Sequence, residues 1–259
     1  MEVIANKIST RSVKLKRIYL SIFLGSMFAN LALAEVNLED LNNIRDLVKN
    51  EQYELALQKH VWFHEESKSS SGMGGVRLSY AISDWVELGN KYPPALSELR
   101  RIRDENQSEM SSGKGTFNNF HDFSSINEQL GDEIKTIELF SSLSKNYPTQ
   151  AKRLYHVVED LLIEKKEFKL VDKYMEDPIF KYETLRHSRE QSLSYARKNP
   201  NRDSSISVEY NDNLFIDKTI TLINALLKLD KKSEAIEIHQ RATRYFKNKK
   251  LESIVIPRP

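Results

Sequence analysis

Apolar positions recur every three or four residues along most of the chain after Glu35, which is the spacing of amphipathic helices. Asn37 is a suitable N-cap for the first of these helices, and the pair Pro93 and Pro94 suits the start of the fourth. The polar stretch NPNRDSSISVEYND interrupts the pattern and predicts a loop or a domain break near residues 199–211. The predicted helices span residues 38–49, 51–67, 76–89, 95–110, 117–130, 132–147, 149–165, 167–175, 178–198, 214–229 and 233–246.

Most of the predicted connections are short, so that neighbouring helices are expected to run antiparallel. Four helix starts share an aromatic or small residue followed three positions later by an apolar residue, and they lie 81, 34 and 65 residues apart: Tyr53–Ala56, Ile134–Ile137, Phe168–Val171 and Ser233–Ile236. The middle spacing equals the length of a tetratricopeptide (TPR) repeat. Residues 37–250 therefore resemble degenerate TPR-like hairpins, although no unit carries the whole consensus. The resemblance implies an all-α, TPR-like antiparallel helical-hairpin solenoid over residues 35–259.

A second resemblance rests on a narrower set of motifs. The runs W-F-H at 62–64, V-R-L-S at 76–79, D-W-x-x-L-G-x-x-Y-P-P-A-L at 84–96 and F-H-D at 120–122 are similar to a group of bacterial TPR-like proteins of unassigned function. That group supplies no activity to carry over to this chain.

The N-terminus has the pattern of a secretory signal peptide. Five basic residues precede an uncharged run of 17 residues from Ile18 to Ala34, which ends in Ala32-Leu33-Ala34 before Glu35. An uncleaved membrane anchor is the alternative, but the run is short and contains polar residues, whereas a membrane span needs about 20 apolar residues. We therefore expect residues 1–34 to be removed and the product to be periplasmic or secreted, with no stable membrane span.

Removal of the leader would change the charge of the protein. The whole chain carries a net charge of +2, and its first 34 residues contribute five basic groups and one acid, a net of +4. The mature chain is therefore near −2 and lacks the dense positive footprint that nucleic-acid binding requires, so no nucleic-acid partner is expected. With no cysteine, it has neither disulfides nor a thiolate metal site.

Two histidines are the first candidates for chemistry. His60 and His64 lie four residues apart and share one helix face, where they could bind a single divalent metal. The zinc-protease motif H-E-x-x-H is absent, no third ligand has a diagnostic spacing, and the same face is apolar. Two histidines packed in a helix interface are therefore preferred to a metal site. The loop SSGKGT lacks the spacing of a phosphate-binding loop, and no cofactor is expected.

Two glycine-rich loops, SSSGMGG and SSGKGT, are expected at the same end of the helical stack. Alternating helix directions would bring His64, Arg77, His121 and Asp122 to that end. Asp84 lies two helical turns from Arg77 on the same helix face, so these two are not expected to touch, and a structural ion pair to another helix is the preferred interpretation of each. The five residues are the candidate ligand-binding set.

Two functions remain open from the sequence. The first is an exported helical-repeat scaffold that binds a protein or peptide partner, because repeat arrays form extended concave surfaces and no catalytic motif is evident. The alternative is a small-ligand-binding protein or a metal-dependent enzyme that uses the polar corner around His64, Arg77 and His121. No catalytic residue is assigned in either case.

Overall fold

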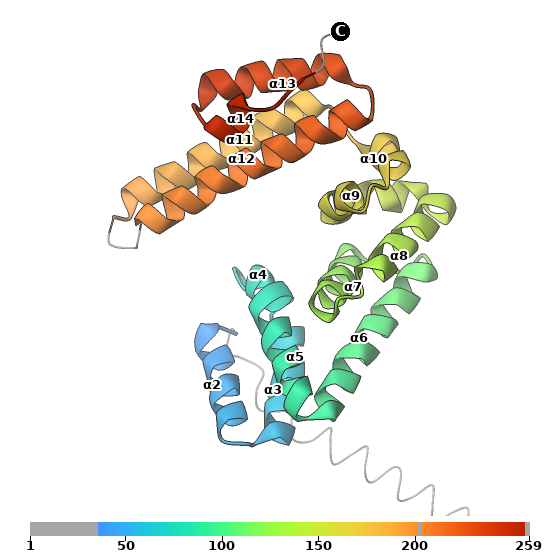
Figure 1. Cartoon of the computed structure of the whole chain (residues 1–259). Coiled ribbons are helices and arrows are strands. Elements are labelled where there is room, and N and C mark those ends of the chain that lie inside the picture. The colour runs from blue at the N-terminus through green and yellow to red at the C-terminus, as the bar shows by residue number, and fades with distance from the viewer. Residues whose placement is uncertain (1–35, 201–203, 257–259) are drawn as a thin grey trace, which may run out of the picture. The chain divides into compact units, whose positions relative to one another are not determined.

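The computed structural model describes residues 36–200 and 204–256, and every regular element in this part of the chain is a helix. The predicted signal peptide, residues 1–34, lies outside the described residues. Consecutive helices pack against each other in pairs (Figure 1), which confirms the all-α class and is compatible with a helical-repeat fold. The chain divides into two compact units at Leu96 and Ser97, in the first turn of α6 (Pro93–Ser111).

The first unit is built around helix α3, which contacts the helices on either side of it in the chain. The apolar core side chains are nearly all fully buried, with Phe63 and Trp85 the largest of them, and the buried polar residues His60, His64 and Arg77 belong to the same unit. Trp85 donates a hydrogen bond from Nε1 to the carbonyl oxygen of Ala95 at 2.9 Å, which satisfies its one polar atom. The elements are α2 (Leu38–Lys49), α3 (Tyr53–Glu66), α4 (Gly74–Val76), the π-helical segment η1 (Arg77–Ala81) and α5 (Ile82–Lys91).

A π-helical segment lies inside the third predicted helix. The sequence predicted one regular helix over residues 76–89, whereas the structure has a helical stretch from Gly74 to Lys91 in which residues 77–81 are π-helical. Such segments are rare and are frequent at functional sites. This one begins at Arg77, one of the candidate binding residues.

The second unit contains two hydrophobic clusters. One cluster joins α7, α8, α9 and α10 around Phe120, Phe123 and Phe140. The other joins α11, α12, α13 and α14 around Tyr182 and Phe215. The elements are α7 (Phe117–Leu130), α8 (Glu133–Asn146), α9 (Pro148–Glu164), α10 (Phe168–Tyr174), α11 (Pro178–Lys198), α12 (Ser204–Lys228), α13 (Lys232–Tyr245) and α14 (Lys249–Glu252).

The polar stretch at residues 199–212, predicted to be a loop or a domain break, is helical from Ser204 onward. Helix α12 already begins at Ser204, ten residues before the predicted start at residue 214. Its early turns pack against α11 in a long hairpin (Figure 1), and this tertiary contact compensates for the weak helix propensity of the serines and asparagines. The possible domain break near residues 199–211 stays a prediction.

Four helical hairpins share the same turn. In α2–α3, α7–α8, α9–α10 and α12–α13, one residue adopts a left-handed conformation and the second helix begins two residues later. The backbone N–H of the next residue donates to a carbonyl five residues earlier at 2.8–2.9 Å, as in a Schellman motif. The left-handed residues are Glu51 (φ 60°), Gly131 (φ 69°), Lys166 (φ 62°) and Asp230 (φ 58°).

The hairpins also share a buried position. The residue five places after each left-handed residue has no exposed surface: Ala56, Thr136, Val171 and Ala235. The predicted repeat starts at Tyr53 and Phe168 agree with this register, whereas those at Ile134 and Ser233 are one residue late. The buried residue is apolar in three of the hairpins. In the second hairpin it is Thr136, whose Oγ1 accepts a hydrogen bond of 3.1 Å from Asn127 Nδ2.

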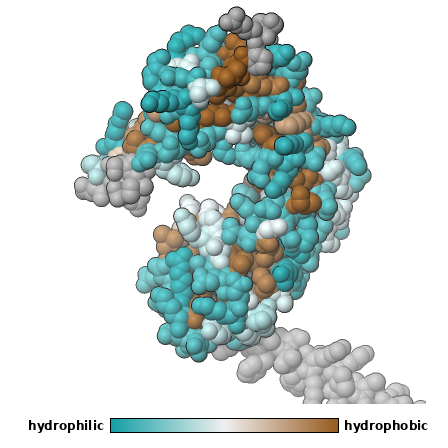
Figure 2. All heavy atoms as spheres, viewed as in Figure 1, coloured by the Kyte–Doolittle hydropathy of each residue, from teal (hydrophilic) through white to brown (hydrophobic). Residues whose placement is uncertain are grey.

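The surface is mostly polar on the face shown in Figure 2, where hydrophobic side chains gather in separate patches on each unit. Within residues 36–200 and 204–256, no helix has both the length and the apolar character that would let it cross a membrane.

Candidate functional site

The two histidines of α3 are buried against a tryptophan in the first unit. His60 is 1% exposed and stacks on Trp85 with ring centroids 5.3 Å apart, while His64 meets the same ring edge-on at 6.1 Å. Neither ring nitrogen of His60 has a hydrogen-bond partner. The pKa of His60 is lowered to about 3, mainly by burial and additionally by the charges of Arg45 and His64. His60 is therefore an uncharged core residue at neutral pH.

Arg77 and Asp84 lie on the same helical stretch but have different surroundings. Arg77 is 3% exposed, at the start of the π-helical segment that packs against α3. Asp84 accepts a hydrogen bond from Arg45 Nε at 2.8 Å, so that an ion pair joins α5 to α2. Burial raises the pKa of Asp84, and the hydrogen bond from Arg45 opposes that shift. The predicted ion pair to another helix is confirmed for Asp84.

His121 and Asp122 belong to the second unit, near the start of α7. Asp122 is buried, and His121 is half-buried with its ring edge-on to Phe117 at 5.3 Å. Phe117 stacks in turn on His156 of α9 at 5.4 Å. Because His64 and Arg77 belong to the first unit, the convergence of His64, Arg77, His121 and Asp122 on one corner stays a prediction.

Metal binding was weighed for the pair His60 and His64. In the part of the chain that the structure describes, no three His, Cys, Asp or Glu side chains are grouped so that they could hold a metal ion. The stacking of His60 on Trp85 agrees with the interpretation of these histidines as packed interface residues.

A cavity of about 650 Å³ lies between α11 and α13 in the second unit. We call it the arginine groove; it is lined by Tyr182, Glu183, Arg186, Glu237, Gln240, Arg241, Arg244 and Tyr245. Three guanidinium groups and two carboxylates leave this lining with one excess positive charge.

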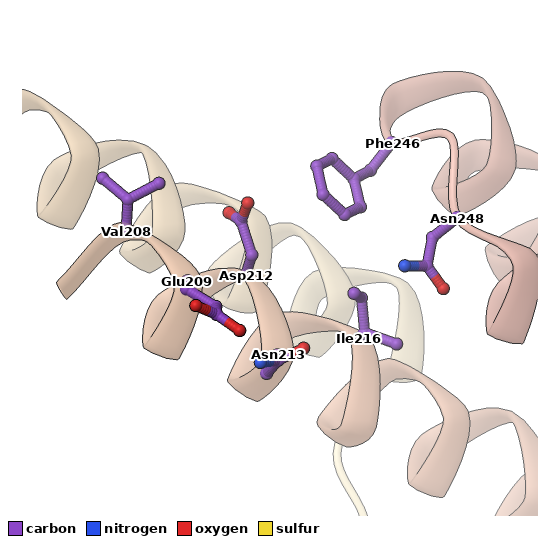
Figure 3. Close-up of a pocket in the computed structure, with 7 residues that line it drawn as sticks. All are labelled: Val208, Glu209, Asp212, Asn213, Ile216, Phe246 and Asn248. Atoms are coloured by element: carbon purple, nitrogen blue, oxygen red, sulfur yellow. The ribbon is translucent and has the colours of Figure 1, made fainter. Parts of the chain in front are cut away.

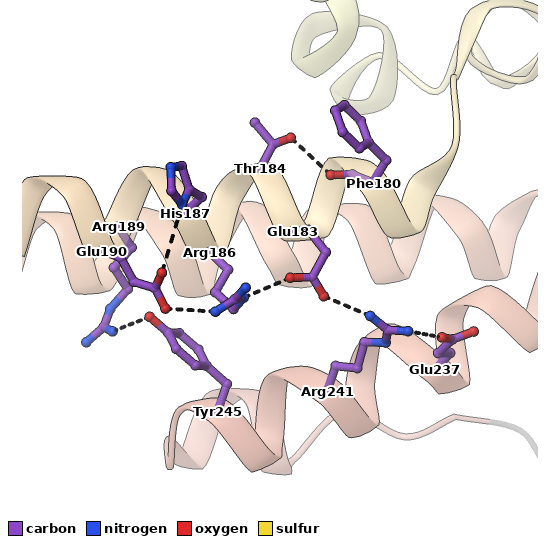
Figure 4. Close-up of polar contacts among 10 residues, drawn as sticks. All are labelled: Phe180, Glu183, Thr184, Arg186, His187, Arg189, Glu190, Glu237, Arg241 and Tyr245. Carbon is purple, nitrogen blue, oxygen red and sulfur yellow. Dashed lines mark hydrogen bonds and ion pairs between the residues drawn. The ribbon is translucent and has the colours of Figure 1, made fainter.

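A chain of alternating charges runs along the groove (Figure 4). Glu183 accepts from Arg186 at 2.8 Å within α11 and from Arg241 of α13 at 2.8 Å, which joins the two helices. The chain continues from Arg186 to Glu190 and from Arg241 to Glu237, both at the favourable spacing of four residues. The hydrogen bonds from Arg186 and then Arg241 lower the pKa of Glu183. These contacts fix the orientation of both guanidinium groups.

Tyr182, Gln240 and Arg244 carry donors that this chain of charges does not include. Tyr182 is 1% exposed, and its hydroxyl has no hydrogen-bond partner. Burial raises its pKa to about 12, with the charge of Glu183 as the next cause, so the hydroxyl keeps its proton at neutral pH. Arg244 is exposed and makes no ion pair with another described residue.

Arg189 contacts Tyr245, one of the residues that line the groove. Its guanidinium pairs with Asp212 of α12 at 2.7 Å and donates to the Tyr245 hydroxyl at 2.9 Å. It also lies 4.3 Å from the ring centroid of Phe246, a cation–π contact. The side chain of Arg189 is only 11% exposed. This group, the Arg189 cluster, consists of Arg189, Asp212, Phe215, Tyr245 and Phe246.

A second cavity, of about 520 Å³, is lined in part by Asp212 and Phe246 of the Arg189 cluster. Val208, Asp212 and Ile216 project from successive turns of α12 toward Phe246 and Asn248, which follow α13 (Figure 3). Glu209 and Asn213 complete the lining. The two acidic side chains give this second cavity the opposite charge to the arginine groove.

The arginine groove was not predicted from the sequence. The run ETLRHSRE shows glutamates and arginines three or four residues apart, which indicates a charged helix face. The sequence does not show that Arg241, 58 residues after Glu183, reaches the same carboxylate. This long-range pairing links α11 to α13, and the two helices together form the groove.

Comparison of the chain with protein-family models, with curated proteins and with solved structures gives no match.

Proposed function

We propose that this protein is an exported, TPR-like helical-repeat scaffold that binds a peptide segment of a partner in the arginine groove. The four hairpins with a common turn and a common buried position support the repeat architecture. The observation that carries the function is the groove itself, which combines a pocket of about 650 Å³, oriented arginines and two tyrosines. Tyrosine and arginine are enriched at the energetic centres of protein interfaces.

The test is selection of peptides from an unbiased displayed library against the full chain. We expect enriched peptides to bind saturably and to lose at least about tenfold in affinity, or about 1.4 kcal/mol, when Gln240→Trp fills the groove. Gln240 is an exposed lining residue, so the larger side chain enters the cavity without disturbing the core.

Gln191→Trp is the matched control, because Gln191 is an exposed glutamine of α11 outside the groove lining. It is expected to leave binding unchanged. Failure to enrich any peptide, or equal binding to the parent and to Gln240→Trp, would contradict the proposal.

Export is the second part of the proposal, and it rests on the basic start, the uncharged run and Ala32-x-Ala34. Mass spectrometry of the protein from the cell envelope is expected to show Glu35 as the N-terminal residue. Recovery of the intact chain, beginning at Met1, from the cytoplasm would show that the leader is not a signal peptide.

A further inference from the structure

The polar groups that remain available in the arginine groove are mainly hydrogen-bond donors. Arg244 has no ion-pair partner among the described residues, and the buried Tyr182 hydroxyl has no acceptor. A buried hydroxyl without a partner is uncommon in proteins, because it forfeits the hydrogen bond that it makes in water. A ligand that supplies acceptors would satisfy both groups.

The carboxylates of the lining are already paired with arginines. Glu183 already holds two guanidinium groups, and Glu237 accepts from Arg241 at 2.6 Å. Each guanidinium carries five donors. Arg186 uses two of its three nitrogen atoms in the bonds to Glu183 and Glu190, and Arg241 likewise bonds through two of three. Both arginines thus keep donors for a further acceptor while their orientation is fixed.

The geometry points to an acidic peptide as the ligand of the arginine groove, with its carboxylates accepting hydrogen bonds from Arg244, from the remaining donors of Arg186 and Arg241, and from the Tyr182 hydroxyl. This inference rests on the proposed peptide-binding function. Arginine suits the role because its planar fork matches the two oxygens of a carboxylate. The side chains of Arg186 and Arg241 are 36% and 41% exposed, so a ligand can reach them.

The test is fluorescence anisotropy of the full chain with labelled hexaglutamate, hexaglutamine and hexalysine. We expect hexaglutamate to bind at least about tenfold more tightly than hexaglutamine, with hexalysine weakest. Added salt should weaken hexaglutamate binding because the groove is open to solvent.

Two variants separate the groove from a general charge effect. Arg244→Gln and Tyr182→Phe are each expected to weaken hexaglutamate binding several-fold and to leave hexaglutamine binding unchanged. Arg197→Gln removes an exposed arginine of α11 outside the lining and should have no effect. Circular dichroism and melting of each variant confirm that it is folded.

The outcomes distinguish this inference from the function on which it rests. Equal binding of hexaglutamate and hexaglutamine, or equal losses in Arg244→Gln and Arg197→Gln, would overturn the acidic preference and leave peptide binding intact. If no peptide of the unbiased library binds either, the proposed function fails with it. Selective loss in Arg244→Gln and Tyr182→Phe would establish both.

Discussion

Replacement of Arg189 by alanine is expected to destabilise the second unit by about 1–3 kcal/mol, because it leaves the partners of a partly buried ion pair and hydrogen bond unsatisfied. The change would leave Asp212 without its cation and the Tyr245 hydroxyl without its donor, and it would remove the contact with the Phe246 ring. Denaturant unfolding, followed by hydrogen exchange in α11 and α12, measures the loss.

Arg197→Ala is the control for this prediction, because Arg197 is an exposed arginine on the same helix. Surface substitutions of this kind usually change stability by no more than about 0.5 kcal/mol. If the two variants unfolded at the same denaturant concentration, the Arg189 cluster would contribute little to holding α11, α12 and α13 together.

Acid is expected to destabilise the first unit through His60. The folded-state pKa of about 3 lies below the unfolded value of 6.5. Between these pH values the unfolded chain therefore binds a proton at His60 and the folded chain does not. The contribution of a neutral His60 is complete above the unfolded pKa and is lost as the pH falls from there toward 3. Linkage gives a loss of about 2 kcal/mol between pH 7 and pH 5.

His60→Leu should remove that part of the pH dependence while keeping an apolar contact with Trp85. Hydrogen exchange of the α3 and α5 amides at pH 7 and pH 5 measures this loss of stability in the first unit, separately from the titration of groups elsewhere. His187→Gln is the control, since the side chain of His187 is 66% exposed on α11. An unchanged pH dependence in His60→Leu would show that His60 is not buried in its neutral form.

Most of the helices could be predicted from the sequence because residues that favour helix starts or helix ends mark the limits of the amphipathic stretches. Gly131 ends α7 in the left-handed conformation, and Pro148 and Pro178 occupy first turns. The start of α12 was missed because its serines and asparagines favour loops when they are isolated. Its stabilisation comes from tertiary contacts such as the Arg189–Asp212 ion pair.

The candidate site was harder to predict than the fold. The burial of His60 and Trp85 follows from the apolar face of α3 and from the size of the aromatic ring. The π-helical turn at Arg77 has no comparable sequence signal. The arginine groove depends on Glu183 and Arg241 meeting across two helices, which only the folded chain reveals.

Hydrogen exchange of the full chain with and without a library-selected peptide tests the central claim most directly, because it locates the binding surface without a substitution. We expect the bound peptide to slow amide exchange in α11 and α13, the two helices that line the arginine groove. Slower exchange confined to α2, α3 and α5 of the first unit, with α11 and α13 unchanged, would contradict the claim.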